Sequence, residues 1–222
     1  VVQAIEEIRE RQLHGEHIIC VKHSHDLLIE HGIIPWATML LDPRSHVQDF
    51  IENPHPGVIY FLASMCHPTT LDRLLEKKAD VWGYHAYVGA EEPAWLKQLG
   101  IQADMVAGGS TSAVRGIMVL RMMGFRQFVL YGYDSCYWDE RNFDEKTKTG
   151  HPKYVKVTVN GRNFVTDLEL IAQVQDFMQL MKIDIGIDIE CRGDGIIPHL
   201  WNTQRPIKPK FEDVFGRIST SG

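Results

Sequence analysis

Residues 103–135 read ADMVAGGSTSAVRGIMVLRMMGFRQFVLYGYDS and contain the clearest indication of the architecture. The first five residues predict a short strand, and Gly108 and Gly109 predict a tight turn. Residues 112–123 are apolar almost all round, which predicts a buried helix. The apolar residues 127–133 then predict a second strand. A strand, a helix and a second strand in this order are typical of a parallel β-α-β unit.

The same alternation continues on both sides of this unit. Further strands are predicted at 17–21, 36–41, 58–63, 81–84 and 185–189, and further helices at 4–13, 25–31, 45–53, 69–78, 93–100 and 166–182. This pattern predicts a three-layer, Rossmann-like α/β fold, in which seven strands form one mainly parallel sheet covered by helices on both faces. The 222 residues suit a single domain of this kind.

One segment interrupts the alternation. Residues 139–153 are polar and highly charged, and the valines that follow alternate with polar residues up to Asn160–Gly161, a strong turn signal. We therefore predict an inserted loop and β-hairpin over residues 139–165. Polar insertions of this length often act as lids. Residues 199–222 are predicted to form a C-terminal tail.

Composition excludes several classes of protein. The chain has 29 acidic and 23 basic residues and a formal charge of -6, which argues against a nucleic-acid-binding surface. No apolar run approaches the roughly 18 residues of a membrane span, and the first residues do not resemble a signal peptide. We expect a cytoplasmic protein without a membrane partner. Its four cysteines are too widely spaced for a zinc or redox motif and are expected to be reduced thiols.

Polar and ionisable side chains follow the carboxyl ends of the predicted strands. In open parallel sheets this edge binds ligands. We expect the following residues to contact substrate there: Lys22, His23, His67, His85 and Asp194. The histidines lack the spacing of a zinc site and would bind substrate or buffer a proton. The alternative is that these residues are polar only because they lie in loops.

The turn after the 103–107 strand is a candidate phosphate site. Its residues are Gly108, Gly109, Ser110, Thr111 and Ser112. The two glycines allow close approach of the backbone, and the next helix would point its free N–H groups at a ligand. The turn is neither a Walker loop nor a G-x-G-x-x-G fingerprint. Its hydroxyl groups could instead serve only as helix caps.

Two aspartates, Asp42 and Asp134, each follow an apolar strand. They could share a magnesium ion, which takes one or two carboxylates together with the phosphates of a ligand. The alternative is that each one caps a loop or pairs with an arginine, Arg44 or Arg115.

Several segments together resemble the 6-hydroxymethylpterin diphosphokinase MptE-like family, which includes the motility accessory factors of flagellin glycosylation. The segments are 32–36, 41–43, 63–68, 108–116, 124–126, 130–135 and 193–198. The resemblance spans residues 17–198. It implies a Rossmann-like domain that uses a nucleotide. Family members commonly open with a strand ending in a G-x-G-P-S-L-like loop, and no such loop precedes His17. Either the sequence given begins after that loop, or this branch binds its nucleotide without it.

The resemblance leads us to expect a magnesium-dependent transferase that moves diphosphate from ATP to an acceptor resembling a hydroxymethyl pterin. The catalytic residues would be Asp42, Asp134 and Arg115, with Arg115 or Lys22 offsetting the developing charge. The expected partners are a nucleotide and a small-molecule acceptor, and a homo-oligomer is left open.

Two other functions stay open. The Gly-Tyr-Asp segment at 132–134 also resembles the bacterial sialyltransferases, so transfer of a CMP-linked nonulosonic sugar is one alternative. In those enzymes a catalytic histidine lies in the loop that here reads Gly161–Val165, where Arg162 cannot act as a base. His151 or His85 would have to replace it. The other alternative is a nucleotide- or sugar-binding module without catalysis.

Overall fold

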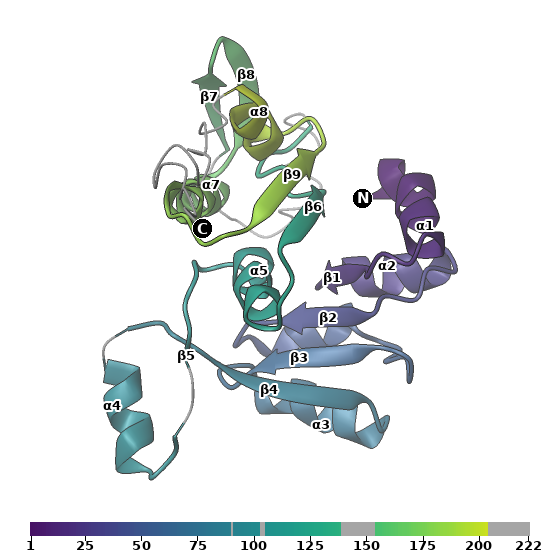
Figure 1. The fold of residues 1–222 in the computed structure, drawn as a ribbon, viewed down its shortest axis with the longest axis vertical. Helices are drawn as coiled ribbons and strands as arrows, with labels where there is room; N and C mark the ends of the chain where they lie inside the picture. Colours follow the sequence, from purple (N-terminus) through teal and green to yellow (C-terminus); the bar gives the residue numbers. More distant parts are fainter. Residues whose placement is uncertain (90, 103–104, 139–153, 204–222) are drawn as a thin grey trace, which may run out of the picture.

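The computed structural model describes residues 1–89, 91–102, 105–138 and 154–203. These residues form a mixed α/β fold with parallel strands and helices on both sides, which confirms the Rossmann-like prediction (Figure 1). The predicted loop at 139–153, including His151, lies outside the described residues. So do residues 103 and 104 of the predicted fifth strand.

Five strands form the larger sheet. In spatial order they are β1 (Ile19–Val21), β2 (Ala37–Leu40), β3 (Ile59–Ala63), β4 (Asp80–Ala86) and β5 (Met105–Val106), and all neighbours are parallel. The elements that precede or connect them are η1 (Val2–Ala4), α1 (Ile5–Leu13), α2 (Ser24–Glu30), η2 (Ser45–Phe50), α3 (Pro68–Glu76) and α4 (Glu91–Gln98). Successive strands pair in chain order, so right-handed crossovers place α2, η2 and α3 on one face.

The central strands β2 and β3 of this sheet are largely buried on both faces. All four residues of β2 are buried, as expected for a parallel strand covered by two layers. Because successive side chains point to opposite faces, Leu40 joins the cluster with Val47 and Leu74, while Met39 joins the cluster with Val119. The first cluster lies under η2 and α3, and the second lies under α5 (Ser112–Met122).

The helix α5 lies between two sheets, which explains its apolar character on all sides. Beyond it, β6 (Gln127–Tyr131) pairs in parallel with β9 (Asp188–Arg192), and α7 (Leu168–Lys182) and α8 (Ile196–Thr203) cover this pair. Their core contains Val114 and Ile117 of α5, Phe177 of α7, Ile189 of β9 and Trp201 of α8. The predicted buried helix is thus confirmed, and it serves two cores.

The prediction of a single seven-stranded sheet is wrong, because the seven parallel strands divide into sheets of five and two. Side chains of α1, rather than backbone hydrogen bonds to β1, connect β6 to the larger sheet. Ile5 and Ile8 pack with Cys20 of β1, and Tyr131 of β6 packs against the same cluster. The last strand also begins three residues later than predicted, after Gly186, which has a φ of +66°.

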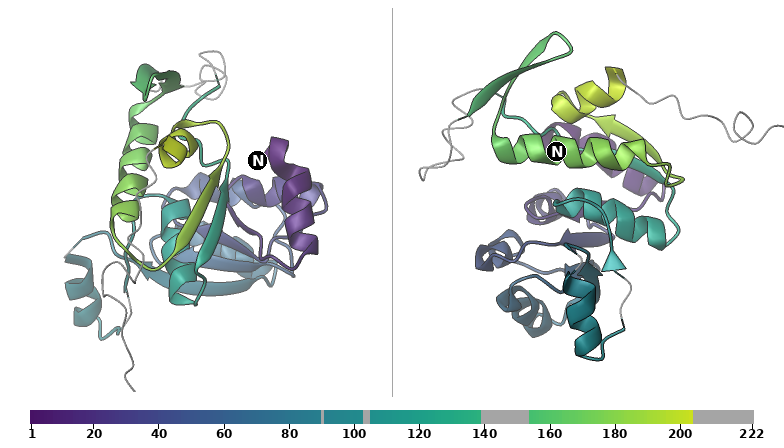
Figure 2. Two further views of the ribbon diagram at one scale, coloured as in Figure 1. Left: turned by 45° about the horizontal axis from the view of Figure 1, so that its top comes forward. Right: turned by 90° about the vertical axis from the view of Figure 1, so that its left-hand side faces the viewer.

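The predicted hairpin is confirmed. Strands β7 (Val155–Val159) and β8 (Arg162–Thr166) are antiparallel, and Val159 pairs with Arg162. Asn160 and Gly161 both have positive φ, as a type I′ turn requires. The hairpin stands at the N-terminal end of α7 (Figure 2). Residues 199–203, predicted to begin a tail, complete α8 instead, and residues 204–222 lie outside the described residues.

Two further observations concern expectations from composition. The described residues contain no helix that combines the length and the hydropathy needed to cross a bilayer. All four cysteines are free thiols, and burial raises the pKa of Cys66 to about 11.

Candidate functional site

A cleft of about 1500 Å³ lies at the carboxyl ends of β6 and β9. Its walls come from residues 1–4, residues 131–138, the hairpin, the start of α7 and the turn at 192–195. Three of the residues predicted to form the site line it: His23, Asp134 and Asp194. The others do not: Lys22, Asp42, His67, His85, Gly108, Gly109, Ser110, Thr111, Ser112 and Arg115.

Asp134 is held in the cleft by the turn that precedes α8. Its carbonyl oxygen accepts a hydrogen bond from the Ile196 N–H (2.8 Å), and its Oδ1 accepts one from the Gly195 N–H (3.1 Å). A Cβ on Gly195 would lie 2.5 Å from Asp134 Cα, and one on Gly193 would lie 2.5 Å from Asp134 Oδ1. The turn can close on Asp134 only because both positions are glycine.

An ion pair joins the hairpin to the same turn. Arg162 donates two hydrogen bonds to Asp194, of 2.5 and 2.6 Å, and its guanidinium lies 4.8 Å from the centre of the Phe164 ring. Both side chains stay accessible, since Arg162 is 41% and Asp194 72% exposed. The hydrogen bond from Arg162 lowers the pKa of Asp194. A ligand in the cleft would therefore meet a fixed cation and a fixed carboxylate.

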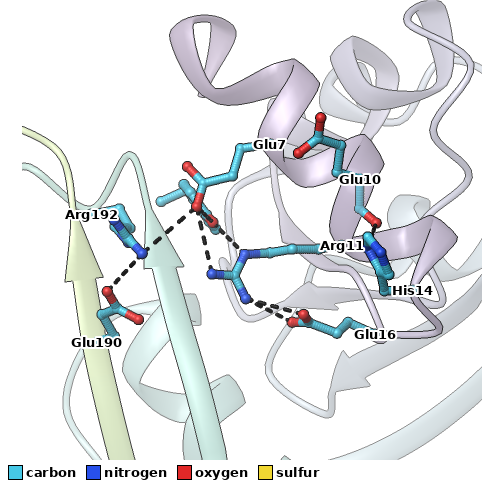
Figure 3. Close-up of polar contacts among 8 residues, drawn as sticks. Glu7, Glu10, Arg11, His14, Glu16, Glu190 and Arg192 are labelled. Atoms are coloured by element: carbon cyan, nitrogen blue, oxygen red, sulfur yellow. Dashed lines mark hydrogen bonds and ion pairs between the residues drawn. The ribbon is translucent and has the colours of Figure 1, made fainter.

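A polar network from α1 forms another part of the wall (Figure 3). Arg11 Nε donates to Tyr131 Oη (2.7 Å), and Tyr131 Oη donates to Glu7 Oε1 (2.7 Å). Arg192 Nη2 lies 2.8 Å from Glu190 Oε1 and 3.9 Å from Glu7 Oε1, so Arg192 pairs with both carboxylates. Sequence reasoning missed this network because charged residues four apart on a helix are typical of any exposed helix face.

Aromatic side chains also face the cleft. Trp138 lines it and is 70% exposed, and Tyr133 and Tyr137 lie nearby in the same segment. Tyr137 Oη donates to Asp167 Oδ2 (2.7 Å), the residue that caps α7. An exposed tryptophan in a cleft that also carries charged side chains is a suitable platform for a planar ring.

Asp42 lies outside the cleft lining, at the end of β2, and is only 7% exposed. Oδ1 accepts from the Arg44 N–H (3.1 Å) and Arg44 Nε (2.8 Å), while Oδ2 accepts from Lys22 Nζ (2.8 Å) and Arg44 Nη2 (2.5 Å). The Arg44 guanidinium, followed by Lys22, holds the pKa of Asp42 well below its usual range. The predicted alternative, pairing with Arg44, is therefore the arrangement observed.

The glycine-rich turn already contacts an internal carboxylate. Asp176 of α7 accepts hydrogen bonds at Oδ2 from the Ser110 N–H (2.8 Å) and Ser110 Oγ (2.6 Å). Thr111 caps α5 by accepting from the Val114 N–H (3.2 Å), as the alternative interpretation of these hydroxyls proposed. A phosphate at Ser110 would have to displace Asp176.

Arg115 is buried within α5, with 3% exposure. Its guanidinium donates to the carbonyl oxygens of Tyr87 (3.1 Å), Gly109 (2.6 Å) and Val106. These carbonyls lie at or just after the ends of β4 and β5, so Arg115 fixes the backbone there. The predicted role of Arg115 on the developing charge has no support from this geometry.

The three predicted histidines lie apart. His23 only occupies the N-cap position of α2, and its ring centre is 3.7 Å from that of Phe50. His67 caps α3 by accepting from the Thr69 N–H (3.3 Å). His85 Nδ1 lies 2.9 Å from Ser64 Oγ. Only His23 borders the cleft, so His85 is poorly placed to act as a base on a ligand bound there.

Of the two aspartates predicted to share a magnesium ion, only Asp134 has a carboxylate oxygen left to bind one. Each Asp42 oxygen already accepts two hydrogen bonds, so neither has a free lone pair for a metal. At Asp134 the described contacts engage Oδ1 alone, and one carboxylate suffices for magnesium when a ligand supplies phosphates. Within the described residues, no three His, Cys, Asp or Glu side chains cluster as a metal site.

The fold and the cleft define a Rossmann-like α/β protein with its candidate site at the carboxyl ends of the strands. A family model, 6-hydroxymethylpterin diphosphokinase MptE-like, matches residues 3–140. The chain belongs to this family. The match covers the larger sheet, α5, β6 and Asp134, but not the hairpin, Arg162 or Asp194. Searches of the curated proteins and of the solved structures found no match.

Proposed function

We propose that the protein is a nucleotide-dependent transferase whose ligands bind in the cleft beside Asp134. The more specific proposal is magnesium-dependent transfer of diphosphate from ATP to a hydroxymethyl-pterin-like acceptor. The family membership supports a pterin diphosphokinase-like or related transferase role. The observation that carries the proposal is the composition of the cleft, in which Asp134, Arg162 and the exposed Trp138 line one space.

Each part of the cleft suits this chemistry. Transfer of a phosphoryl or diphosphoryl group depends mainly on positioning and on electrostatic stabilisation. Asp134 would hold magnesium, which would neutralise charge on the phosphates. Arg162 would bind phosphate oxygens, for which a planar guanidinium is well suited. Trp138 would stack on a purine or pterin ring. In the reaction the acceptor hydroxyl would attack the β-phosphorus of ATP, and AMP would leave.

A thermal-shift screen with ATP plus magnesium, with CMP, and with 6-hydroxymethylpterin tests the proposal. We expect ATP plus magnesium to stabilise the wild type and AMP to form when the pterin is added. The variant Asp134→Asn keeps the acceptor for the Gly195 N–H but loses the charge, so it should weaken ATP binding in magnesium at least tenfold. Asp72→Asn, on the exposed face of α3, is the matched control and should bind as the wild type.

Three outcomes would contradict the proposal or its more specific form. Stabilisation by CMP without any response to ATP would favour sugar transfer from a nucleotide donor. A lack of response to every nucleotide would favour a module without nucleotide-dependent catalysis. Equal ATP affinity in Asp134→Asn and the wild type would exclude Asp134 as the magnesium ligand.

A further inference from the structure

The cluster of Lys22, Asp42 and Arg44 has more cationic donors than its carboxylate can accept. A carboxylate has about four acceptor positions, and all four on Asp42 are occupied. Lys22 uses one of its three ammonium hydrogens there, and Arg44 leaves Nη1 without a partner among the described residues. The cluster carries a net charge of one positive unit. All acceptor positions of Asp42 are therefore used, while Lys22 and Arg44 keep donor hydrogens that Asp42 does not engage.

Burial of Asp42 fixes the two cations in place. Asp42 is 7% exposed, whereas the Lys22 and Arg44 side chains are 31% and 61% exposed. Lys22 has a φ of 46°, a left-handed conformation that is unfavourable for a lysine and is typical of functional loops. The arrangement presents two oriented donors to solvent and keeps the carboxylate behind them.

The cluster lies beside the cleft. Lys22 directly precedes His23, which lines the cleft at the end of β1. Arg44 is joined to Lys22 by the Asp42 carboxylate, whose Oδ2 lies 2.8 Å from Lys22 Nζ and 2.5 Å from Arg44 Nη2. A ligand in the cleft could therefore extend to these cations.

We propose that Lys22 and Arg44, oriented by Asp42, bind a phosphate group of the ligand. This inference rests on the proposed function and names the residues that hold the phosphate farther from Asp134. Asp42 is then a positioning residue and not a metal ligand. The glycine-rich turn is the less suitable phosphate site, because Asp176 occupies the Ser110 donors.

Calorimetric titration with inorganic pyrophosphate, with and without magnesium, tests the inference. Arg44→Gln removes an exposed cation and should weaken pyrophosphate binding at least tenfold, since each charge-assisted hydrogen bond contributes at about that level. Arg44→Lys keeps the positive charge but lacks the planar guanidinium, so its pyrophosphate affinity should lie between those of Arg44→Gln and the wild type. Arg9→Gln, which removes an arginine that pairs with Glu6 on the exposed face of α1, is the matched control.

A variant that is expected to raise pyrophosphate affinity strengthens the test. Glu169 is exposed and acts on Arg44 from α7, so Glu169→Gln should tighten pyrophosphate binding. Equal affinity in Arg44→Gln, Arg9→Gln and the wild type would overturn the inference, as would the absence of pyrophosphate binding to the wild type.

The two proposals can fail separately. If Asp134→Asn loses ATP binding while Arg44→Gln binds ATP as the wild type does, the transferase proposal stands and the phosphate role of Arg44 is wrong. If pyrophosphate binding depends on Arg44 while no nucleotide binds, the phosphate site stands and the nucleotide-dependent function is wrong.

Discussion

Replacing Arg115 by alanine should destabilise the protein by about 4 kcal/mol. The guanidinium donates to the carbonyl oxygens of Tyr87, Val106 and Gly109, and Arg115 is 3% exposed. A hydrogen bond to a charged group contributes about 1.5–3 kcal/mol, so three bonds at the lower value give about 4.5 kcal/mol. Partial rehydration of the carbonyls reduces this slightly. For a chain of this size the loss corresponds to a fall in Tm of roughly 8–16 °C.

Urea unfolding followed by circular dichroism measures this effect directly. Arg115→Lys keeps the positive charge but lacks the planar fork that reaches three carbonyls, so it should recover only part of the stability. Arg9→Ala on the exposed face of α1 should change the free energy of unfolding by less than about 0.5 kcal/mol. If Arg115→Ala were as stable as the wild type yet lost affinity for ATP, the structural role would be refuted and the ligand-binding role predicted from sequence would be correct.

Three further predictions concern the turn, a buried histidine and the glycine-rich loop. Gly195→Ala would place a Cβ 2.5 Å from Asp134 Cα and should lower the free energy of unfolding in urea by about 3 kcal/mol. The control Gly83→Ala, whose Cβ would meet open space, should change it by less than about 1 kcal/mol. Equal urea midpoints for the two variants would contradict this prediction. Burial lowers the pKa of His25, so the unfolded chain binds more protons and stability falls as the pH drops below about 6.5. His25→Gln should reduce the slope of the unfolding free energy against pH between about pH 7 and 5. An unchanged slope would show that other groups cause the pH dependence. Asp176→Asn should leave pyrophosphate affinity unchanged in calorimetry, and a clear increase would show that phosphate reaches the glycine-rich turn.

Local sequence patterns predicted the elements that depend on local physics. The all-round apolar character of residues 112–123 predicted a buried helix, and α5 indeed packs between two sheets. Alternating valines followed by Asn160–Gly161 predicted the hairpin, because this dipeptide adopts the positive φ values that a tight hairpin turn needs. Both patterns are contained within about a dozen residues.

Contacts between distant segments could not be predicted in this way. Ser110 and Asp176 are 66 residues apart, and no local pattern pairs them. The separation of β6 from β1 has the same origin, since it depends on how Tyr131 packs against α1. The pairing of Asp42 with Arg44 was foreseen as an alternative because the two residues are close in the chain.

The division into two sheets also changes the meaning of the polar residues at the strand ends. In one continuous sheet, all strand ends would border the same groove, and the predicted residues would form one site. Here the larger sheet carries Lys22 and Asp42, and the smaller pair of strands carries Asp134 and Asp194. His23 is the residue that connects them, because it follows Lys22 and lines the cleft beside Asp134. A ligand that needs both groups must therefore span both sheets, so substitutions at Arg44 and Asp134 should both reduce the affinity for the same extended ligand. In the absence of magnesium, the affinity for a short anion such as pyrophosphate should fall on substitution of Arg44 but not on substitution of Asp134.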